Sequence, residues 1–173
     1  MAEWQKRVSE YKERLVAINR ITKVVKGGRR FGFAALVVVG NEKGSIGVGA
    51  GKSKQVPNAI KKATQDATRN LIKISLKDGR TLHHDVKGRN GSGKVIMRSA
   101  PAGTGIIAGG PIRAVCDVLG IQDIVAKSVG SANPHNVVKA SVNALLAQRS
   151  PKLLSAMRGK KISEIISKRE NTK

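Results

Sequence analysis

The sequence has few of the residues that characterise secreted, membrane-spanning or base-stacking proteins. It contains a single cysteine and therefore no internal disulfide, which fits a reducing, cytoplasmic location. Aromatic residues make up 2% of the 173 residues, too few for the wide stacking platform on which proteins hold unpaired bases. No apolar run approaches the roughly 20 residues that span a bilayer, and the N-terminus lacks the apolar segment of a secretory signal. We therefore expect a cytoplasmic protein that does not act at a membrane.

Acidic residues are also scarce. The chain has 11 Asp and Glu against 33 Lys and Arg, a formal net charge of +22, and a field of this sign attracts polyanions. Because aromatic rings are so few, we expect contact with phosphates and with the shape of structured RNA. Residues 1–30 hold nine cations and residues 149–173 hold eight, whereas residues 91–148 hold only five. The near-neutral stretch is thus expected to form core or to contact protein.

The first part of the chain alternates in a way that is typical of strands. Three antiparallel strands are predicted at residues 13–25, 31–40 and 45–52, joined by the tip "KGGRR" and the turn "NEKG". Pro57 predicts the start of a helix that runs to about Lys73, with one apolar and one cationic face.

A second unit begins near Ile74. The Asp78-Gly79 pair predicts a hairpin within residues 74–86, followed by a loop at 88–93 and a strand at 94–100. A helix ending at Gly120, a further strand and a helix capped by Asn133 complete the unit.

These elements predict an α+β fold with two small domains. The expected boundaries are an N-terminal extension over 1–12, a β-β-β-α domain over 13–73, a β-β-β-α-β-α domain over 74–157 and a basic tail over 158–173.

Two glycine-rich stretches invite a nucleotide-binding interpretation, and their spacing argues against it. "GVGAGKSK" (47–54) ends in GK[ST], but the glycine that a phosphate-binding loop needs five positions before Gly51 is replaced by Ile46. A helix that began there would also place Pro57 in its second turn. "GTGIIAGG" (103–110) has one residue too many for a dinucleotide fingerprint, although Asp123 lies where a ribose-binding acid would stand. We expect these glycines to allow close packing.

Catalytic and metal-binding patterns are not found in the sequence. His83 and His84 are adjacent, so on a strand they point to opposite faces, and His135 is distant. Cys116 lies on the apolar stripe of its helix and is expected in the core. We expect no enzyme activity, metal, cofactor or small-molecule substrate.

The sharper signal is a basic ribbon around "KGGRR". Its glycines let the backbone approach phosphates and its cations neutralise them, although an ordinary solvated turn is the alternative. The candidate RNA-binding residues along this ribbon and on the strand and helix beside it are Arg14, Arg20, Lys23, Lys26, Gly27, Gly28, Arg29, Arg30, Lys52, Lys54, Lys61, Lys62 and Arg69.

Four motif blocks in order resemble a known family. "NRITKVVKGGRRFGFAALVVVG", "GVGAGKSKQVPNAIKKA", "GTGIIAGGPIRAV" and "VGSANPHNVVKA" resemble the bacterial-type small-subunit ribosomal protein five family, and the resemblance extends from about Glu13 to Ile166. It implies a first domain like a double-stranded-RNA-binding domain without that domain's leading helix, followed by the C-terminal domain of this family.

The resemblance also implies a function. The family is a structural component of the small ribosomal subunit that binds rRNA at the junction of body and head, neighbours ribosomal proteins four and eight, and lies near the channel through which messenger RNA enters. Lys26, Gly27 and Gly28 match its loop near the spectinomycin site. Gly105 and Arg113 match positions that face ribosomal protein four and affect translational accuracy, while Lys61 and Lys62 match a phosphate-binding helix start in double-stranded-RNA-binding domains.

Two other functions stay open from the sequence. One is a free-standing duplex-RNA-binding module or RNA chaperone, and the other is a nucleotide-binding enzyme. The sequence does not distinguish a bacterial ribosome from that of an organelle.

Overall fold

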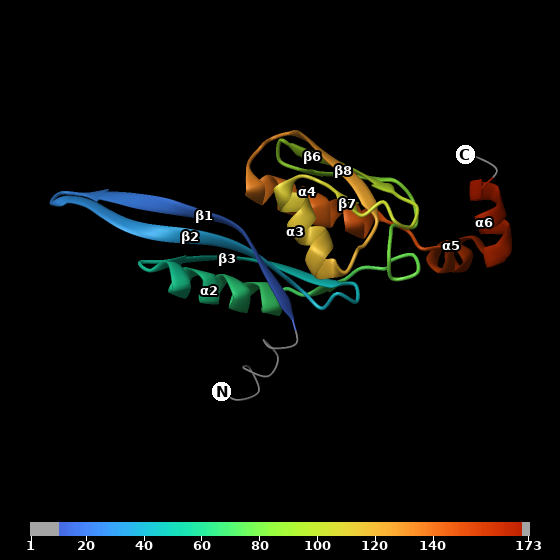
Figure 1. Cartoon of the computed structure of the whole chain (residues 1–173), viewed down its shortest axis with the longest axis horizontal. Helices are drawn as coiled ribbons and strands as arrows, with labels where there is room; N and C mark the ends of the chain where they lie inside the picture. The colour runs from blue at the N-terminus through green and yellow to red at the C-terminus, as the bar shows by residue number, and fades with distance from the viewer. Residues whose placement is uncertain (1–10, 171–173) are drawn as a thin grey trace, which may run out of the picture.

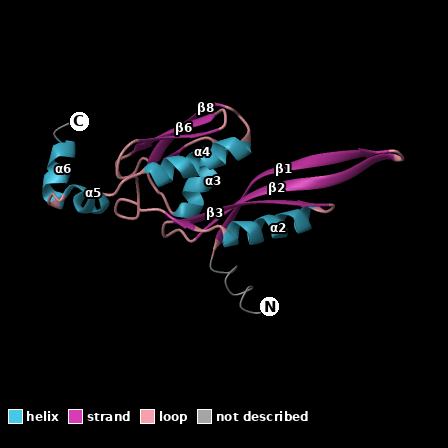
Figure 2. Ribbon diagram, turned by 180° about the vertical axis from the view of Figure 1, so that it is seen from behind, coloured by secondary structure: helices cyan, strands magenta, loops and turns pink. Residues whose placement is uncertain are grey.

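The structure is a computed structural model that describes residues 11–170. Most of the predicted N-terminal extension and the last three residues of the predicted basic tail lie outside the described residues. The chain has an α+β fold built on two four-stranded sheets, in the orders β1-β2-β3-β4 and β5-β6-β8-β7 (Figures 1 and 2). The predicted fold class is therefore confirmed.

The first sheet is antiparallel and carries one long helix. It comprises β1 (Lys12–Val25), β2 (Gly28–Gly40), β3 (Ser45–Ser53) and the short β4 (Ile72–Lys73). Helix α2 (Val56–Arg69) covers one face, with Pro57 in its first turn as predicted. The helix ends at Arg69 rather than near Lys73, because the chain after Asn70 turns extended and pairs with Ser45 and Ile46 of β3.

Glycines of β3 bring α2 unusually close to the sheet. Gly47, Gly49 and Gly51 all face the helix, and a Cβ on any of them would lie less than 3.0 Å from helix backbone. The opposing atoms belong to alanines spaced by four residues: Ala67, Ala63 and Ala59. Two residues of strand and four of helix each advance about 6 to 7 Å, so the two rows stay in step. The glycines of "GVGAGKSK" thus serve helix packing.

The opposite face of the first sheet packs on the second unit. Leu36, Val38 and Ile46 join one continuous hydrophobic core with side chains that include Val115 and Leu145 of the second unit. Ala35, Val37 and Val39 point the other way and form the smaller core under α2. Because strand side chains alternate, β2 is buried on both sides along this stretch.

The second sheet has helices on one face. Its strands are β5 (Val86–Asn90), β6 (Gly93–Ser99), β7 (Ile106–Ile107) and β8 (Ile124–Gly130), with only β7 and β8 parallel. Helices α3 (Gly110–Leu119) and α4 (Pro134–Ala147) pack between the two sheets (Figure 1). Asn133 caps α4 by accepting a 3.1 Å hydrogen bond from the amide of His135, and Gly120 ends α3 in a left-handed conformation.

Two strand predictions in this unit are wrong in detail. Residues 74–86 form no two-stranded hairpin, although a turn with positive φ at Asp78 and Gly79 is present and Lys77 bridges Thr81. The flanks cannot extend into strands because Leu82 is buried in the core and the segment bonds to the loop before β8. The expected loop at 88–93 instead belongs largely to the β5–β6 hairpin, whose two-residue turn is Gly91-Ser92.

Two short helices follow the core. They are α5 (Pro151–Arg158) and α6 (Ile162–Glu170). Among the helices that the structure describes, none is both long enough and apolar enough to cross a membrane.

Candidate RNA-binding surface

The β1–β2 hairpin extends well beyond the rest of the molecule. Strand β3 stops opposite Phe33, and five further pairs of β1 and β2 residues continue without a third strand, from Ile21–Gly32 to Val25–Gly28. At about 3.3 Å per residue, this free ribbon reaches on the order of 20 Å from the sheet. Figure 1 shows it leaving the body at the end farthest from α5 and α6.

Pairing places the ribbon's cations on both of its faces. Lys23 lies directly opposite Arg30 on one face, whereas Arg20 and Arg29 share the other face, the one toward α2. The Arg20 guanidinium stacks 3.8 Å above the centre of the Phe31 ring, a contact worth about 0.5–1 kcal/mol at an exposed site. The stacking therefore restricts the motion of the Arg20 side chain.

The pair of Lys23 and Arg30 is unfavourable in the free protein. Like charges directly opposite in a sheet destabilise it. Both side chains are exposed, and neither forms an ion pair with a carboxylate in the described part of the chain. An anion bound between Lys23 and Arg30 would attract both side chains and so offset their mutual repulsion.

The tip of the hairpin is open. Lys26 and Gly27 form its two-residue turn, and a Cβ at Gly27 or Gly28 would meet no atom within 4 Å. Gly28 has a φ of 128°, which only glycine adopts readily, but Gly27 has neither a positive φ nor a neighbour to avoid. Nothing inside the described chain requires glycine at position 27.

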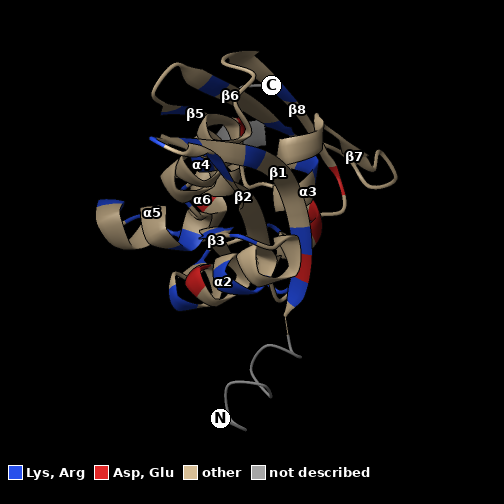
Figure 3. Cartoon of the chain, turned by 90° about the vertical axis from the view of Figure 1, so that its left-hand side faces the viewer, with Lys and Arg blue, Asp and Glu red and all other residues tan. Residues whose placement is uncertain are grey.

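More cations lie where the ribbon joins the body. Lys52 is near the end of β3, Lys54 follows it, and Lys61 and Lys62 lie in the second turn of α2. Strand β3 ends and α2 begins on the side from which the ribbon projects (Figure 1), which is the side that faces the viewer in Figure 3. The structure therefore brings these four residues and the ribbon to one end of the first sheet.

The cationic face predicted for helix α2 also carries a carboxylate. Asp66 lies four residues after Lys62 and three before Arg69, on the same side of the helix. Its carboxylate accepts a 3.1 Å hydrogen bond from the amide of Ala50 and so caps the open edge of β3. Lys61, by helical spacing, is on the face opposite Ala63 and points away from the sheet.

Arg14 lies apart from the ribbon. It is opposite Val38, on the face toward the second unit, and its guanidinium is 3.6 Å from the Asp117 carboxylate of α3. This contact connects β1 to α3, so Arg14 holds the two units together as well as contributing positive charge.

The two predicted protein-contact residues both belong to the second unit, on the loop before β7 and on α3. Gly105 has a φ of 73° in the loop before β7, and Arg113 is exposed on the first turns of α3. The amide of Gly105 donates a 3.0 Å hydrogen bond to Asp123, and its carbonyl accepts a bond from the amide of Ile124. The loop that presents Gly105 is thus anchored from inside.

Asp123 is the buried anchor of this loop. Its carboxylate pairs with the guanidinium of Arg80 and accepts the Gly105 amide, and these bonds hold the pKa of the carboxyl below its usual range. Its own carbonyl accepts a 2.7 Å hydrogen bond from the Thr81 hydroxyl. Asp123 is the acid whose place in the sequence resembled that of a ribose ligand. Because its carboxylate is occupied by protein groups, it serves to anchor the loop instead.

The remaining chemical candidates are structural. Cys116 is fully buried, and burial raises the pKa of its thiol to about 12, so the nucleophilic thiolate does not form near neutral pH. His83 and His84 contact different partners, Ser75 and the amide of Arg149 respectively. Within residues 11–170, no group of three or more His, Cys, Asp or Glu could hold a metal ion.

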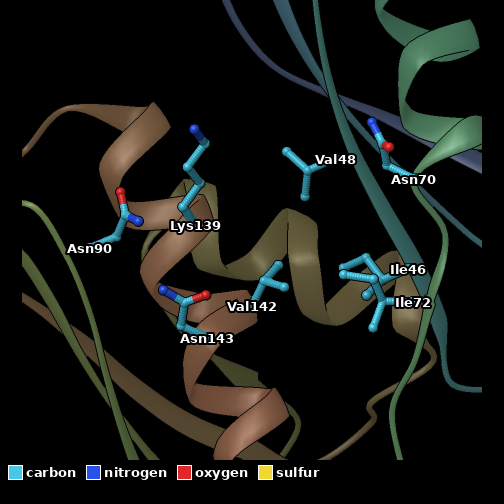
Figure 4. Close-up of a pocket in the computed structure, with 8 residues that line it drawn as sticks. All are labelled: Ile46, Val48, Asn70, Ile72, Asn90, Lys139, Val142 and Asn143. Carbon is cyan, nitrogen blue, oxygen red and sulfur yellow. The ribbon is translucent and has the colours of Figure 1, made fainter.

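A small pocket lies between the two units. Its volume of about 160 Å³ is well below the roughly 300–1,000 Å³ typical of small-molecule sites. Figure 4 shows the residues that line it: Ile46, Val48, Asn70, Ile72, Asn90, Lys139, Val142 and Asn143. Val48 of the stretch 47–54 contributes a side chain to its lining and the stretch 103–110 contributes none, and the volume is too small for a nucleotide.

Comparison with known proteins decides the family. The model of the ribosomal protein S5 N-terminal domain matches residues 11–75, and that of the ribosomal protein S5 C-terminal domain matches residues 88–158. The chain belongs to the ribosomal protein S5 family. The two S5 domain matches fall on the first sheet with α2 and on the second sheet with α3, α4 and α5.

Curated S5 relatives match nearly the whole chain. A protein of Pelagibacter ubique named small ribosomal subunit protein uS5 is 66% identical over 157 residues, which cover 91% of this chain and 92% of the relative. Proteins of the same name from Ruegeria pomeroyi and Methylobacterium radiotolerans are 58% and 60% identical, covering 93% and 96% of this chain and 85% and 86% of the relatives.

Sequence reasoning missed three side chains that shape this surface. Phe31 holds Arg20, Asp66 neutralises part of α2, and Asp117 binds Arg14. The spacing of Asp66 from Lys62 was visible in the sequence, but the other two contacts depend on strand register and on the docking of α3.

Proposed function

We propose that this chain is a structural, non-enzymatic component of the small ribosomal subunit that binds rRNA through the β1–β2 ribbon and its base. The observation that carries the proposal is the free ribbon, with uncompensated cations on two faces and an open glycine tip. Membership of the S5 family, whose curated relatives are named as small-subunit proteins, supports the ribosomal setting.

The mechanism is neutralisation of crowded phosphates. Each Lys or Arg that contacts a phosphate releases counterions, so affinity falls linearly with salt on logarithmic axes, by about 0.7–0.9 in slope for each contact. Lys23, Lys26, Arg29 and Arg30 make the contacts along the ribbon, and Gly27 lets the backbone come near the RNA. Lys52, Lys54, Lys61 and Lys62 contact phosphates at its base, and Arg14, Arg20 and Arg69 add positive charge alongside.

The first test replaces Lys26 and Arg29 with alanine. We expect weaker binding to transcribed small-subunit rRNA and a salt slope lower by roughly two, because two phosphate contacts are lost. A matched control replaces the exposed Lys77 and Lys152, which have the same charge and lie elsewhere. An unchanged slope in the ribbon variant, or an equal loss in the control, would contradict the proposal.

Association with the small ribosomal subunit is tested separately from the RNA contacts of the ribbon. In cell extract containing magnesium, the protein is expected to sediment with the small subunit. Recovery of the whole pool in the ribosome-free fraction would instead favour a free-standing duplex-RNA-binding module or chaperone.

We further propose that the chain occupies the junction of body and head, near the channel through which messenger RNA enters and beside ribosomal proteins four and eight. Contacts of Gly105 and Arg113 with ribosomal protein four contribute to translational accuracy. The support is local: Arg113 is exposed on α3, and Asp123 holds in place the loop that carries Gly105.

Arg113→Ala tests the accuracy role. Because Arg113 lies outside the ribbon, we expect raised misreading in a reporter strain with unchanged affinity for rRNA. Misreading at the level of the unmodified protein would overturn this part of the proposal.

A further inference from the structure

The second sheet leaves one face uncovered by helices. Gly88, Val95 and Met97 face inward, where a Cβ on Gly88 would collide with the backbone of α4. Their neighbours along each strand therefore face outward. Figures 1 and 2 show α3 and α4 on one side of β6 and β8, and no helix or strand of residues 11–170 on the other.

Cations concentrate on this outer face. The exposed residues that point outward from β5, β6 and β8 include Lys87, Arg89, Lys94, Arg98 and Lys127. Arg98 lies 3.6 Å from the Asp85 carboxylate, and the other four form no ion pair with any carboxylate among residues 11–170. The linear sequence hides the cluster, because three of these cations fall in the near-neutral stretch 91–148.

The arrangement is unusual for a merely solvated face. The outer side of an antiparallel sheet is ordinarily polar, but solvated surfaces intersperse both signs of charge. Here no acidic residue of β5, β6 or β8 points outward. Arg89 lies directly opposite Lys94, the same destabilising like-charge pairing that Lys23 and Arg30 form in the β1–β2 ribbon.

We propose that this face is a second RNA-binding surface, which takes the phosphate backbone of helical rRNA. The proposal rests on the proposed function, since it assigns the same ligand a second contact. Lys87, Arg89, Lys94 and Lys127 span three neighbouring strands, about 10 Å across at the usual strand spacing, so one backbone can meet several of them. The first unit then binds RNA through the ribbon, and the second unit binds RNA through this face.

The side chains between the cations favour RNA over a protein partner. Ile96 lies among them half-buried, and Val125 and Val129 lie among them exposed. Protein interfaces are depleted of lysine and enriched in aromatic residues, whereas three of the five cations here are lysines and no aromatic side chain points outward. The same lack of rings argues for backbone contact with a helix rather than stacking of unpaired bases.

The test is the salt dependence of rRNA binding by the full chain with four outward charges removed. The variant carries Lys87→Gln, Arg89→Gln, Lys94→Gln and Lys127→Gln. We expect affinity for transcribed small-subunit rRNA to fall at least about tenfold near 0.1 M salt, and the slope to fall by roughly two to four. The matched control carries Lys43→Gln, Lys77→Gln, Lys152→Gln and Lys160→Gln, four exposed cations outside both surfaces. An unchanged far-ultraviolet circular dichroism spectrum and an unchanged thermal midpoint establish that both variants are folded.

The outcomes separate this inference from the proposed function. If the Lys26 and Arg29 variant weakens binding and the sheet variant does not, the second surface is refuted while the ribbon stands. An equal loss in the control also refutes it, because net charge alone then explains the effect. Normal rRNA binding with lost assembly into reconstituted subunits would assign the face to a protein partner. Salt-independent binding by the unmodified chain would overturn both proposals.

Discussion

At the scale of single residues, glycine has two separable roles in this chain. Gly49 faces α2, where the carbonyl of Ala63 and the amide of Ala67 occupy the space of a side chain. Gly27 has open space around it and a φ that other residues adopt. Packing therefore requires glycine at position 49, and only an external partner can require it at position 27.

This contrast predicts opposite effects for one added methyl group. We expect Gly49→Ala to lower the free energy of unfolding by about 1–3 kcal/mol or more, because the helix must move off the sheet. Gly27→Ala is expected to leave stability within about 0.5 kcal/mol and to weaken rRNA binding instead. Urea unfolding and rRNA titration of both variants check this, and a Gly49→Ala chain as stable as its parent would contradict the packing account.

The sequence identified such residues better than it explained them. The spacing around Gly51 correctly argued against a phosphate-binding loop, and apolar periodicity correctly placed Cys116 in the core. The partners of Asp123 could not be predicted from the sequence in the same way. Its contacts with Arg80 and Gly105 join segments separated by 43 and 18 residues, and no local pattern records which segments meet.

At the scale of elements, the β1–β2 hairpin combines two parts with different stability. Its lower half is the centre of the first sheet, with Val37, Val38 and Val39 buried against helices on both sides. Its outer half, beyond Phe33, pairs only with itself. An isolated two-stranded ribbon is marginally stable in water, so the outer half depends on the sheet below it.

Shortening the ribbon should therefore separate folding from binding. Replacing residues 22–31 with Asn-Gly joins Ile21 to Gly32, which are directly paired and of the same pair type as Val25 and Gly28 at the present turn, through a favoured two-residue turn. We expect little change in the thermal midpoint and a large loss of rRNA affinity. A matched variant keeps the length but replaces Lys23, Lys26, Arg29 and Arg30 with threonine. It distinguishes the effect of the ribbon's charge on affinity from the effect of its length. Full affinity in the shortened chain would be incompatible with the proposed site.

Strand prediction succeeded where the pattern was long and failed where it was short. The alternation over 13–25 and 31–40 spans many residues and gave the main hairpin correctly. The Asp78-Gly79 turn was also correct, but its flanks are held by tertiary hydrogen bonds. "GRNGSG" looked like a loop, yet it forms the end of β5 and the start of β6 on either side of the Gly91-Ser92 turn. Turn chemistry locates the reversal of the chain but does not fix how far pairing extends.

At the scale of the whole molecule, the two units share a core. Leu36, Val38 and Ile46 of the first sheet pack with residues of α3 and α4, and Arg14 forms an ion pair with Asp117 of α3. The separate domains expected from the sequence at 13–73 and 74–157 thus meet through a continuous apolar contact. A junction of this kind fits the proposal that two surfaces of the chain bind RNA in a fixed relation.

The charge distribution shows why a folded chain can differ from its sequence average. Residues 91–148 read as nearly neutral, yet Lys94, Arg98 and Lys127 come together with Lys87 and Arg89 on one face of the second sheet. Register and sheet order create this cluster, and neither is visible from composition. The ribbon, by contrast, is contiguous in sequence and was predictable.

The central claim is that the cations of the ribbon lie against ribosomal RNA. The most direct measurement is acylation of lysines in the full chain, free and bound to protein-free small-subunit rRNA, read by mass spectrometry residue by residue. We predict strong protection of Lys23 and Lys26, together with Lys87, Lys94 and Lys127 on the second sheet, while Lys43, Lys77 and Lys152 stay reactive. Equal reactivity of Lys23 and Lys26 in the free and bound chain would contradict the account.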